Sequence, residues 1–204
     1  MPTAVDLNSM TFFAGVDPCK TRLGEVGHDR FVMAIGAYNG EKIFLVRFIE
    51  GRFGIEEQVA IILQASKQFN LGLINIEEDM AVSELLKRYP EINVNSSQSL
   101  LSKDVRLQSL GSAALRGQIL FPGQLGDSGM LEPVDELEEF LNEWRHYPGS
   151  KHDDFLDALD KLREAINLGV EPASVIFRRS SVTERELGKR HQSRLLFHRE
   201  IRVI

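Results

Sequence analysis

The stretch Met10–Lys20, Met-Thr-Phe-Phe-Ala-Gly-Val-Asp-Pro-Cys-Lys, decides the fold. Its residues are apolar on both alternating faces up to Asp17, and Pro18 follows that acid at once. Such a run predicts a strand buried on both faces, which proline ends because it has no N–H for the ladder. A carboxylate at the end of a buried strand costs free energy unless it is paired or bound to a cation. Asp17 is therefore a candidate functional residue, the alternative being an acid that opens a glycine-rich turn.

Two further extended segments follow this predicted strand. Phe31–Tyr38 is apolar almost throughout, Asn39-Gly40 is a strong hairpin signal, and Lys42–Ile49 alternates as a returning strand would. Together the three segments predict an antiparallel meander in which Asp17 ends the first strand.

Beyond the meander, helical and extended patterns alternate. An amphipathic helix is predicted over Ile55–Phe69, a short strand over Leu71–Ile76, and a second helix that ends before Pro90. Strands separated by helices predict parallel pairing. The later predicted segments are a strand at Ile92–Asn95, a helix from Ser102 to Arg116, a strand at Ile119–Phe121, a loop or hairpin tip at Pro122–Gly129, an amphipathic segment at Val134–Trp144 and a helix from near His152 to about Leu168. The sequence thus predicts an α/β fold with a mixed β-sheet, an antiparallel meander plus parallel strands, flanked by helices.

The composition is typical of one globular domain. The chain has 204 residues and a net charge of −6, and residues 170–204 carry 8 Lys and Arg residues against 4 Asp and Glu residues. We expect a folded domain over residues 1–169 and a basic C-terminal appendage over 170–204. No apolar stretch approaches the ~20 residues that span a bilayer, and residues 1–8 lack a secretory signal pattern. Cys19 is the single cysteine, which excludes a cysteine-based zinc site. Taken together, these features predict a cytoplasmic protein with no membrane contact.

Acidic residues recur at three places where a predicted strand ends or a helix begins. Asp17 ends the first strand, Glu77-Glu78-Asp79 follows another, and Asp153-Asp154 opens the last helix. Two-metal hydrolysis needs such carboxylates, because two divalent cations roughly 3.5–4 Å apart clamp the attacking water and the leaving oxygen of a phosphodiester. The cations in turn relieve the repulsion between the acids. In the second cluster we choose Glu77, which lies nearest the strand; Glu78 and Asp79 can equally be acids at the start of a helix.

The position of each acid on the last helix depends on which face is buried. The predicted apolar stripe consists of Phe155, Leu159, Leu162 and Ile166. At about 100° per residue, Asp154 lies at one edge of that stripe, whereas Asp157 and Asp160 lie on a predicted solvated face. Asp153 can join the site from the first turn, or it can simply favour the helix dipole there.

Four motifs, in order along the chain, carry a resemblance to a known family. They are Phe-Phe-Ala-Gly-Val-Asp-Pro, Ile-Asn-Ile-Glu-Glu, Ser-Lys-Asp-Val-Arg with the later Arg-Gly-Gln-Ile-Leu-Phe-Pro, and Lys-His-Asp-Asp-Phe-Leu-Asp-Ala-Leu. From about residue 10 to 168 the chain resembles the nuclease domain of tailed-phage large terminases. The resemblance implies an RNase H-like fold and a Mg²⁺- or Mn²⁺-dependent endonuclease with two divalent cations. It also implies cleavage of double-stranded viral DNA during bacteriophage genome packaging, in the cytoplasm of the infected bacterial host.

The resemblance implies roles for particular residues as well. Asp17, Glu77, Asp153 and Asp154 would be the catalytic, metal-binding acids. Lys103 and Arg106 would touch the DNA backbone or bridge to the acids, and a plain solvated pair is the alternative. The remaining candidates for the surroundings of the metals are His152, which can also be only a helix-start residue, and Asp157.

A complete large terminase also has an ATPase motor, and this chain has no Gly-x-x-x-x-Gly-Lys-Ser/Thr loop. We therefore expect an isolated or separately encoded nuclease domain whose partners are double-stranded DNA, the ATPase motor domain, the small terminase subunit and the portal. Two alternatives remain. A junction resolvase or RNase H would prefer four-way junctions or RNA–DNA hybrids, and a non-catalytic docking module would bind the packaging motor without cutting DNA.

Overall fold

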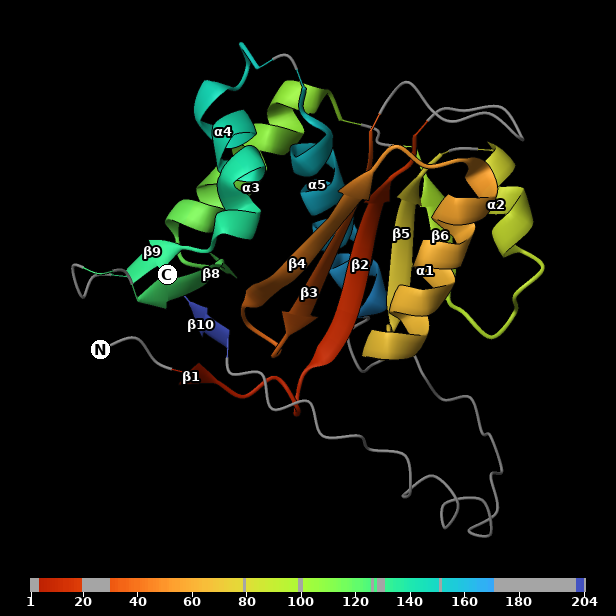
Figure 1. The fold of residues 1–204 in the computed structure, drawn as a ribbon, viewed down its shortest axis with the longest axis horizontal. Helices are drawn as coiled ribbons and strands as arrows, with labels where there is room; N and C mark the ends of the chain where they lie inside the picture. The colour runs from red at the N-terminus through yellow and green to blue at the C-terminus, as the bar shows by residue number, and fades with distance from the viewer. Residues whose placement is uncertain are drawn as a thin grey trace, which may run out of the picture.

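The computed structural model describes residues 4–19, 30–78, 80–98, 101–125, 127, 131–150, 152–170 and 201–203. Its centre is a six-stranded sheet in the order β6-β5-β2-β3-β4-β7 (Figure 1). The meander consists of β2 (Thr11–Asp17), β3 (Phe31–Tyr38) and β4 (Ile43–Gly51), which pair antiparallel. On one side β5 (Leu73–Glu77) and β6 (Val94–Ser97) add in parallel to β2, and on the other β7 (Ile119–Leu120) adds in parallel to β4.

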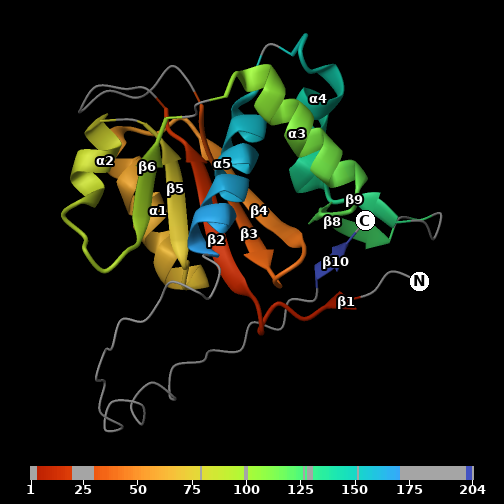
Figure 2. The same ribbon diagram turned by 180° about the vertical axis from the view of Figure 1, so that it is seen from behind.

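Helices cover both faces of this sheet, and the strand alternation decides which residues each layer meets. On one face, α1 (Ile55–Phe69) and α2 (Met80–Leu86) pack on Ala14 and Val16 of β2 and on the matching positions of β3 and β5. On the other face, α5 (Asp154–Gly169) packs on Phe13 and its neighbours. Figures 1 and 2 show α1 and α5 on opposite sides of the sheet.

A second helical layer lies outside α5. It consists of α3 (Lys103–Leu115), the 3₁₀ turn η1 (Asp135–Leu137) and α4 (Glu138–His146), whose apolar residues share one core with α5. Phe140 of α4 and Phe155 of α5 both pack against Phe48, with ring centroids 5.1 and 4.9 Å from it. In Figure 2, α3 and α4 lie beside α5, and their packing together with that of the sheet leaves residues 155–162 of α5 buried.

A small second sheet brings the two ends of the chain together. Its order is β1-β10-β8-β9, with all three pairings antiparallel. The strands are β1 (Ala4–Val5), β8 (Pro122–Leu125), β9 (Leu131–Pro133) and β10 (Ile201–Val203). Where a loop or hairpin tip is predicted at Pro122–Gly129, the chain instead begins a strand at Pro122, because β10 and β9 supply backbone partners on its two sides.

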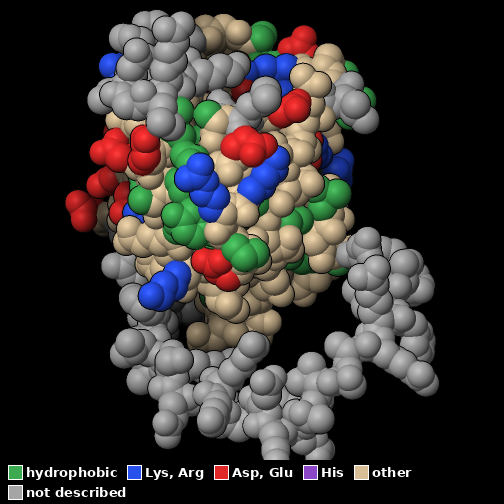
Figure 3. Space-filling model, turned by 90° about the vertical axis from the view of Figure 1, so that its right-hand side faces the viewer, with side chains coloured by type: hydrophobic (Ala, Val, Ile, Leu, Met, Phe, Trp, Pro, Cys, Tyr) green, Lys and Arg blue, Asp and Glu red, His purple; other side chains and the backbone are tan. Residues whose placement is uncertain are grey.

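The surface beside α1 and α2 has a mixed character. Figure 3 shows acidic and basic side chains interspersed with apolar ones on this side of the molecule. No extended area of a single charge is visible on that face. Within the described ranges, no helix is both long enough and apolar enough to cross a membrane.

The mixed α/β sheet with Asp17 on an interior strand is confirmed, as are the helix at Ile55–Phe69 and the parallel addition of β5 and β6 to the meander. The predicted helix that begins near His152 begins at Asp154 and ends at Gly169. The sequence of the tail also predicts short strands at 175–177 and 195–204 and a short helix at 183–190. Beyond Gly169 only residues 170 and 201–203 are described, and 201–203 form β10 within the second of these predicted strands. The other two predicted segments lie outside the described residues.

One glycine sets the distance between α5 and the sheet. A Cβ at Gly15 of β2 would lie 2.0 Å from the Leu162 backbone nitrogen and 2.2 Å from the Ala158 carbonyl oxygen of α5. Both atoms belong to the backbone, so no side-chain rotation can relieve such a clash. The helix therefore lies directly on β2 because position 15 has no side chain.

We predict that Gly15→Ala destabilises the fold by about 3 kcal/mol or more, because overpacking here must push a helix backbone off the sheet. Urea unfolding followed by circular dichroism measures the change. The matched control is Gly111→Ala on α3, where a Cβ would meet nothing within 4 Å. There we expect a gain of about 0.5–1 kcal/mol from helix propensity. Equal stabilities of Gly15→Ala and the parent would contradict the close packing of α5 on β2.

Candidate metal centre

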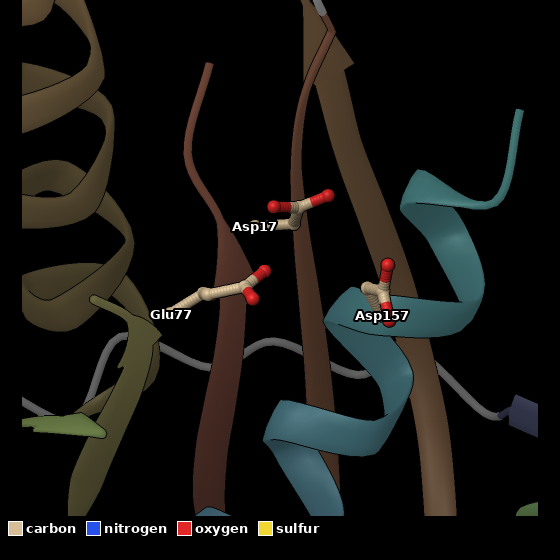
Figure 4. A group of neighbouring side chains, drawn as sticks. All are labelled: Asp17, Glu77 and Asp157. Carbon is tan, nitrogen blue, oxygen red and sulfur yellow. The ribbon is translucent and has the colours of Figure 1, made fainter. Parts of the chain in front are cut away.

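Three carboxylates from three separate elements meet at one end of the central sheet. Asp17 is the last residue of β2, Glu77 is the last residue of β5, and Asp157 lies in the first turn of α5. Each offers a carboxylate oxygen, and these oxygens all lie within 4.8 Å of one another. Figure 4 shows the Asp17 and Glu77 side chains turned toward each other between the strand ends and α5. Residues 15 and 17 of β2 and residues 75 and 77 of β5 share the face that α5 covers, since strand side chains alternate.

The expectation that Asp157 and Asp160 face solvent is wrong. Asp157 is 7% exposed and Asp160 is fully buried. The prediction assumed that α5 buries a single stripe, whereas side chains of α3 also pack against α5 and bury the face that carries these two acids. Asp157 therefore joins Asp17 and Glu77, a position that the helical wheel favoured for Asp154.

Cations from α3 neutralise the buried acids of α5. The Lys103 ammonium lies 2.5 Å from both Asp153 Oδ2 and Asp157 Oδ2. The Arg106 guanidinium lies 2.7 Å from Asp160 Oδ2 and 3.4 Å from Asp157 Oδ1. The sequence left three alternatives for Lys103 and Arg106: contact with the DNA backbone, a bridge to the acids, or a solvated pair. In the structure both residues bridge to the acids. Arg106 is only 8% exposed, so it is not a surface contact for a large ligand.

Asp153 and Asp154 lie beside the three central acids without completing their group. Asp153 is the N-cap residue of α5 but makes no capping hydrogen bond, and its carboxylate is turned to Lys103. Asp154 Oδ2 is buried without a hydrogen-bond partner among the described residues, and His152 Nδ1 lies 3.9 Å from it. The half-exposed His152 is thus a neighbour of Asp154. Glu78 is exposed, and Asp79 lies outside the described residues.

Glu143 is a residue of this region that the sequence pattern missed. It lies on α4, is 5% exposed, and its Oε2 accepts a hydrogen bond from the Phe155 backbone N–H at 3.0 Å. It therefore caps α5 from a neighbouring helix, a task that N-cap side chains usually perform. Burial raises the pKa of Glu143 to about 7, with the charges of Asp154 and Asp153 adding to the effect. A glutamate within an amphipathic helix has no local signal for such a role.

The electrostatics of the centre favour a bound cation. Burial raises the pKa of Asp17 to about 9, and the charges of Asp157, Glu77 and Asp154 add to the effect. Burial likewise raises the pKa of Asp157 and that of Asp154. At neutral pH the metal-free centre thus holds a proton that a divalent cation would displace. Hard carboxylate oxygens, together with the unpartnered Asp154 Oδ2, fit Mg²⁺ or Mn²⁺.

Comparison with known proteins identifies the fold. No family model and no curated protein sequence matches the chain. Among solved structures, it is similar to the large terminase of the thermophilic bacteriophage D6E, with a TM-score of 0.57 and 10% identity over 81% of this chain and 42% of that one. It is also similar to the large terminase nuclease domain of Thermus phage P74-26, with a TM-score of 0.50 and 16% identity over 75% of this chain and 78% of that one. The chain thus spans about two fifths of the D6E terminase and has the RNase H-like fold of the terminase nuclease, as predicted.

We predict that Asp17→Asn stabilises the metal-free protein near neutral pH. The folded-state pKa of about 9 lies above the ordinary value of 3.8, so between these values the native state holds a proton that the unfolded state releases. Metal-free stability therefore falls as pH rises through this range, and the substitution should remove that fall. Thermal unfolding in EDTA at several pH values between about 4 and 9 measures it. Asp135→Asn, at an exposed position of η1, is the control; identical pH dependence of parent and Asp17→Asn would refute the crowding of charges.

Proposed function

We propose that this chain is a nuclease that cuts double-stranded viral DNA during bacteriophage genome packaging, with two Mg²⁺ or Mn²⁺ ions as cofactors. The observation that carries the proposal is the meeting of Asp17, Glu77 and Asp157 within 4.8 Å at the ends of interior strands. Carboxylates crowded in this way, on an RNase H-like fold, are suited to metal-assisted phosphodiester hydrolysis. The fold alone would not support the proposal, because one fold serves many functions.

In this proposal the central acids and their neighbours bind different cations. Asp17, Glu77 and Asp157 would hold one cation, and Asp153 and Asp154 are the candidates for the second. When bound, the cations supply a nucleophilic water and neutralise the charge that develops on the phosphate.

Protein groups around the acids orient them. Lys103 and Arg106 each bind a carboxylate oxygen of Asp157, so they fix its rotamer and leave its geometry little freedom. Glu143 holds the first turn of α5, which carries Asp153 and Asp154, through the Phe155 amide. In this proposal Lys103, which is 35% exposed at the edge of the cluster, also meets a phosphate oxygen of the entering strand.

Other parts of the chain must attract the DNA, since an acidic centre repels it. The basic residues of the tail are the second candidate set: Arg178, Arg179, Arg185, Lys189, Arg190 and Arg194. They lie outside the described residues, and their assignment rests on charge alone. The proposal further assigns the ATPase motor, the small terminase subunit and the portal as partners in the infected bacterial cytoplasm, as the resemblance to terminases implies.

We predict that Asp17→Asn, Glu77→Gln and Asp157→Asn each reduce plasmid cleavage by at least about a hundredfold, because each removes a ligand of the cation. Cleavage with Mg²⁺, Mn²⁺ or EDTA measures the effect, and Asp135→Asn should cut like the parent. Full activity in EDTA would overturn the proposal. Strong preference for four-way junctions or RNA–DNA hybrids over plain duplex would instead identify a resolvase or an RNase H.

We predict that replacing the six basic tail residues by Gln lowers the salt dependence of DNA binding and leaves the cleavage of bound DNA unchanged. Every phosphate that is no longer neutralised should reduce the slope of log K against log salt by about 0.9. Fluorescence anisotropy with a labelled duplex at several salt concentrations measures the slope. The full-length chain is preferable to a truncation, because β10 near its end pairs with β8 and β1. Lys67→Gln on α1 is the control, and an unchanged slope would show that the tail binds something other than DNA.

A further inference from the structure

A polar layer, buried at Asn75 and Lys161 and partly exposed at its other members, lies between α5 and the edge of the sheet where β5 and β6 pair. Its members are Asn75, Asn95, Ser97, Lys161 and Glu164. The Lys161 ammonium is fully buried and lies 3.0 Å from Glu164 Oε2 and 3.1 Å from the Ser97 carbonyl oxygen. Asn75 donates to Glu164 Oε2 at 2.9 Å and accepts from Asn95 at 2.7 Å and from Ser97 at 3.1 Å. Partial burial acts to raise the pKa of Glu164, but the hydrogen bond from Lys161 outweighs it and holds that pKa below its usual range.

This polar layer is built on the same elements as the metal centre, one step further along each. Asn75 precedes Glu77 by two residues on β5, so both side chains point to α5. Lys161 follows Asp157 by four residues on α5, so both lie on one face of that helix. The Ser97 carbonyl oxygen accepts a hydrogen bond from the Lys161 ammonium. In the parallel pairing of β5 and β6, Ser97 is the register partner of Glu77. The hydrogen bond from Lys161 to Ser97 therefore links α5, four residues beyond Asp157, to the position of β6 that lies opposite Glu77.

Stability does not explain the presence of such a layer. A buried ion pair loses hydration that its mutual attraction barely restores, and apolar residues of similar volume often stabilise a fold as well or better. What the polar layer adds is a set of directional hydrogen bonds between α5 and the sheet. Lys161 and Asn75 each bind several partners at fixed distances, whereas apolar contacts would allow α5 to slide along the strands.

We propose that Lys161, Glu164 and Asn75 are positioning residues that fix the separation of Glu77 and Asp157 and so tune the affinity and size selectivity of the metal centre. This proposal rests on the proposed function. The three residues bind no cation themselves; they act through Ser97 and through the backbones of β5 and α5. Ions of different size demand different ligand spacings, so an acid pair held rigidly discriminates between them and a loosely held pair does not.

The test replaces the ion pair by apolar residues of similar size, Lys161→Met with Glu164→Leu, in the full-length chain. Isothermal titration with Mn²⁺ and with Ca²⁺ measures affinity, and thermal unfolding in EDTA measures stability. We expect metal-free stability that is unchanged or higher, Mn²⁺ affinity about tenfold lower, and a smaller ratio of Mn²⁺ to Ca²⁺ affinity. The matched control is Lys87→Met with Glu84→Leu, an exposed pair with the same spacing at the C-terminal end of α2, where Lys87 is the first residue after the helix; it should bind both ions like the parent.

Each other outcome is decisive as well. Unchanged Mn²⁺ affinity and unchanged ion selectivity in the folded double variant would overturn the positioning role and leave the proposed function intact. If the double variant does not fold, Ser97→Ala decides, because it removes only the hydroxyl that donates to Asn75 and Glu164 and accepts from Lys161. A severalfold drop in Mn²⁺ affinity in Ser97→Ala at unchanged stability supports the proposal, and parent-like binding overturns it. A parent protein that binds no Mn²⁺ would refute the proposed function, and the positioning role with it.

Discussion

The direct contact of α5 with β2 is the constraint on which the rest of the structure depends. At Gly15 the helix backbone lies where any other residue would place a side chain, so the helix axis has one permitted height above the sheet. That height brings Asp157 to the level of Asp17, and the parallel pairing of β2 with β5 brings Glu77 alongside. The crowding of three acids is thus a result of backbone packing. The pKa of Asp17 is high because the same packing buries this carboxyl, and the neighbouring acids add to the effect.

The acids that are buried on α5 need polar partners, and α3 and α4 supply them. Buried carboxylates without partners would strongly destabilise the fold. Lys103 and Arg106 of α3 pair with Asp153, Asp157 and Asp160, and Glu143 of α4 supplies the cap that Asp153 does not. The outer helices therefore neutralise and orient the acids in addition to covering apolar surface.

Local patterns predicted what depends on neighbours in the sequence. The alternation along Thr11–Asp17 and Leu73–Glu77 placed Asp17 and Glu77 correctly at the ends of buried strands. Asp157 was misplaced because a wheel with one apolar stripe assumes one buried side, and only the tertiary packing of α3 and α4 buries the other. Glu143 and the pairing of the small sheet were missed for a related reason, since an inter-helix cap and the pairing of strands of two to four residues are specified by distant partners.

The small sheet also fixes where the two ends of the described chain lie. Because β1 pairs with β10, residues 4 and 202 lie side by side, away from the ends of β2 and β5 that carry the acids (Figure 1). A polypeptide joined at either end would therefore project from one common region, away from the end of the sheet that carries the acids. The same proximity makes the domain a natural subject for circular permutation. A short link could join the old ends, and new ones could open at the exposed Asn39-Gly40 turn, where Gly40 has free space around it.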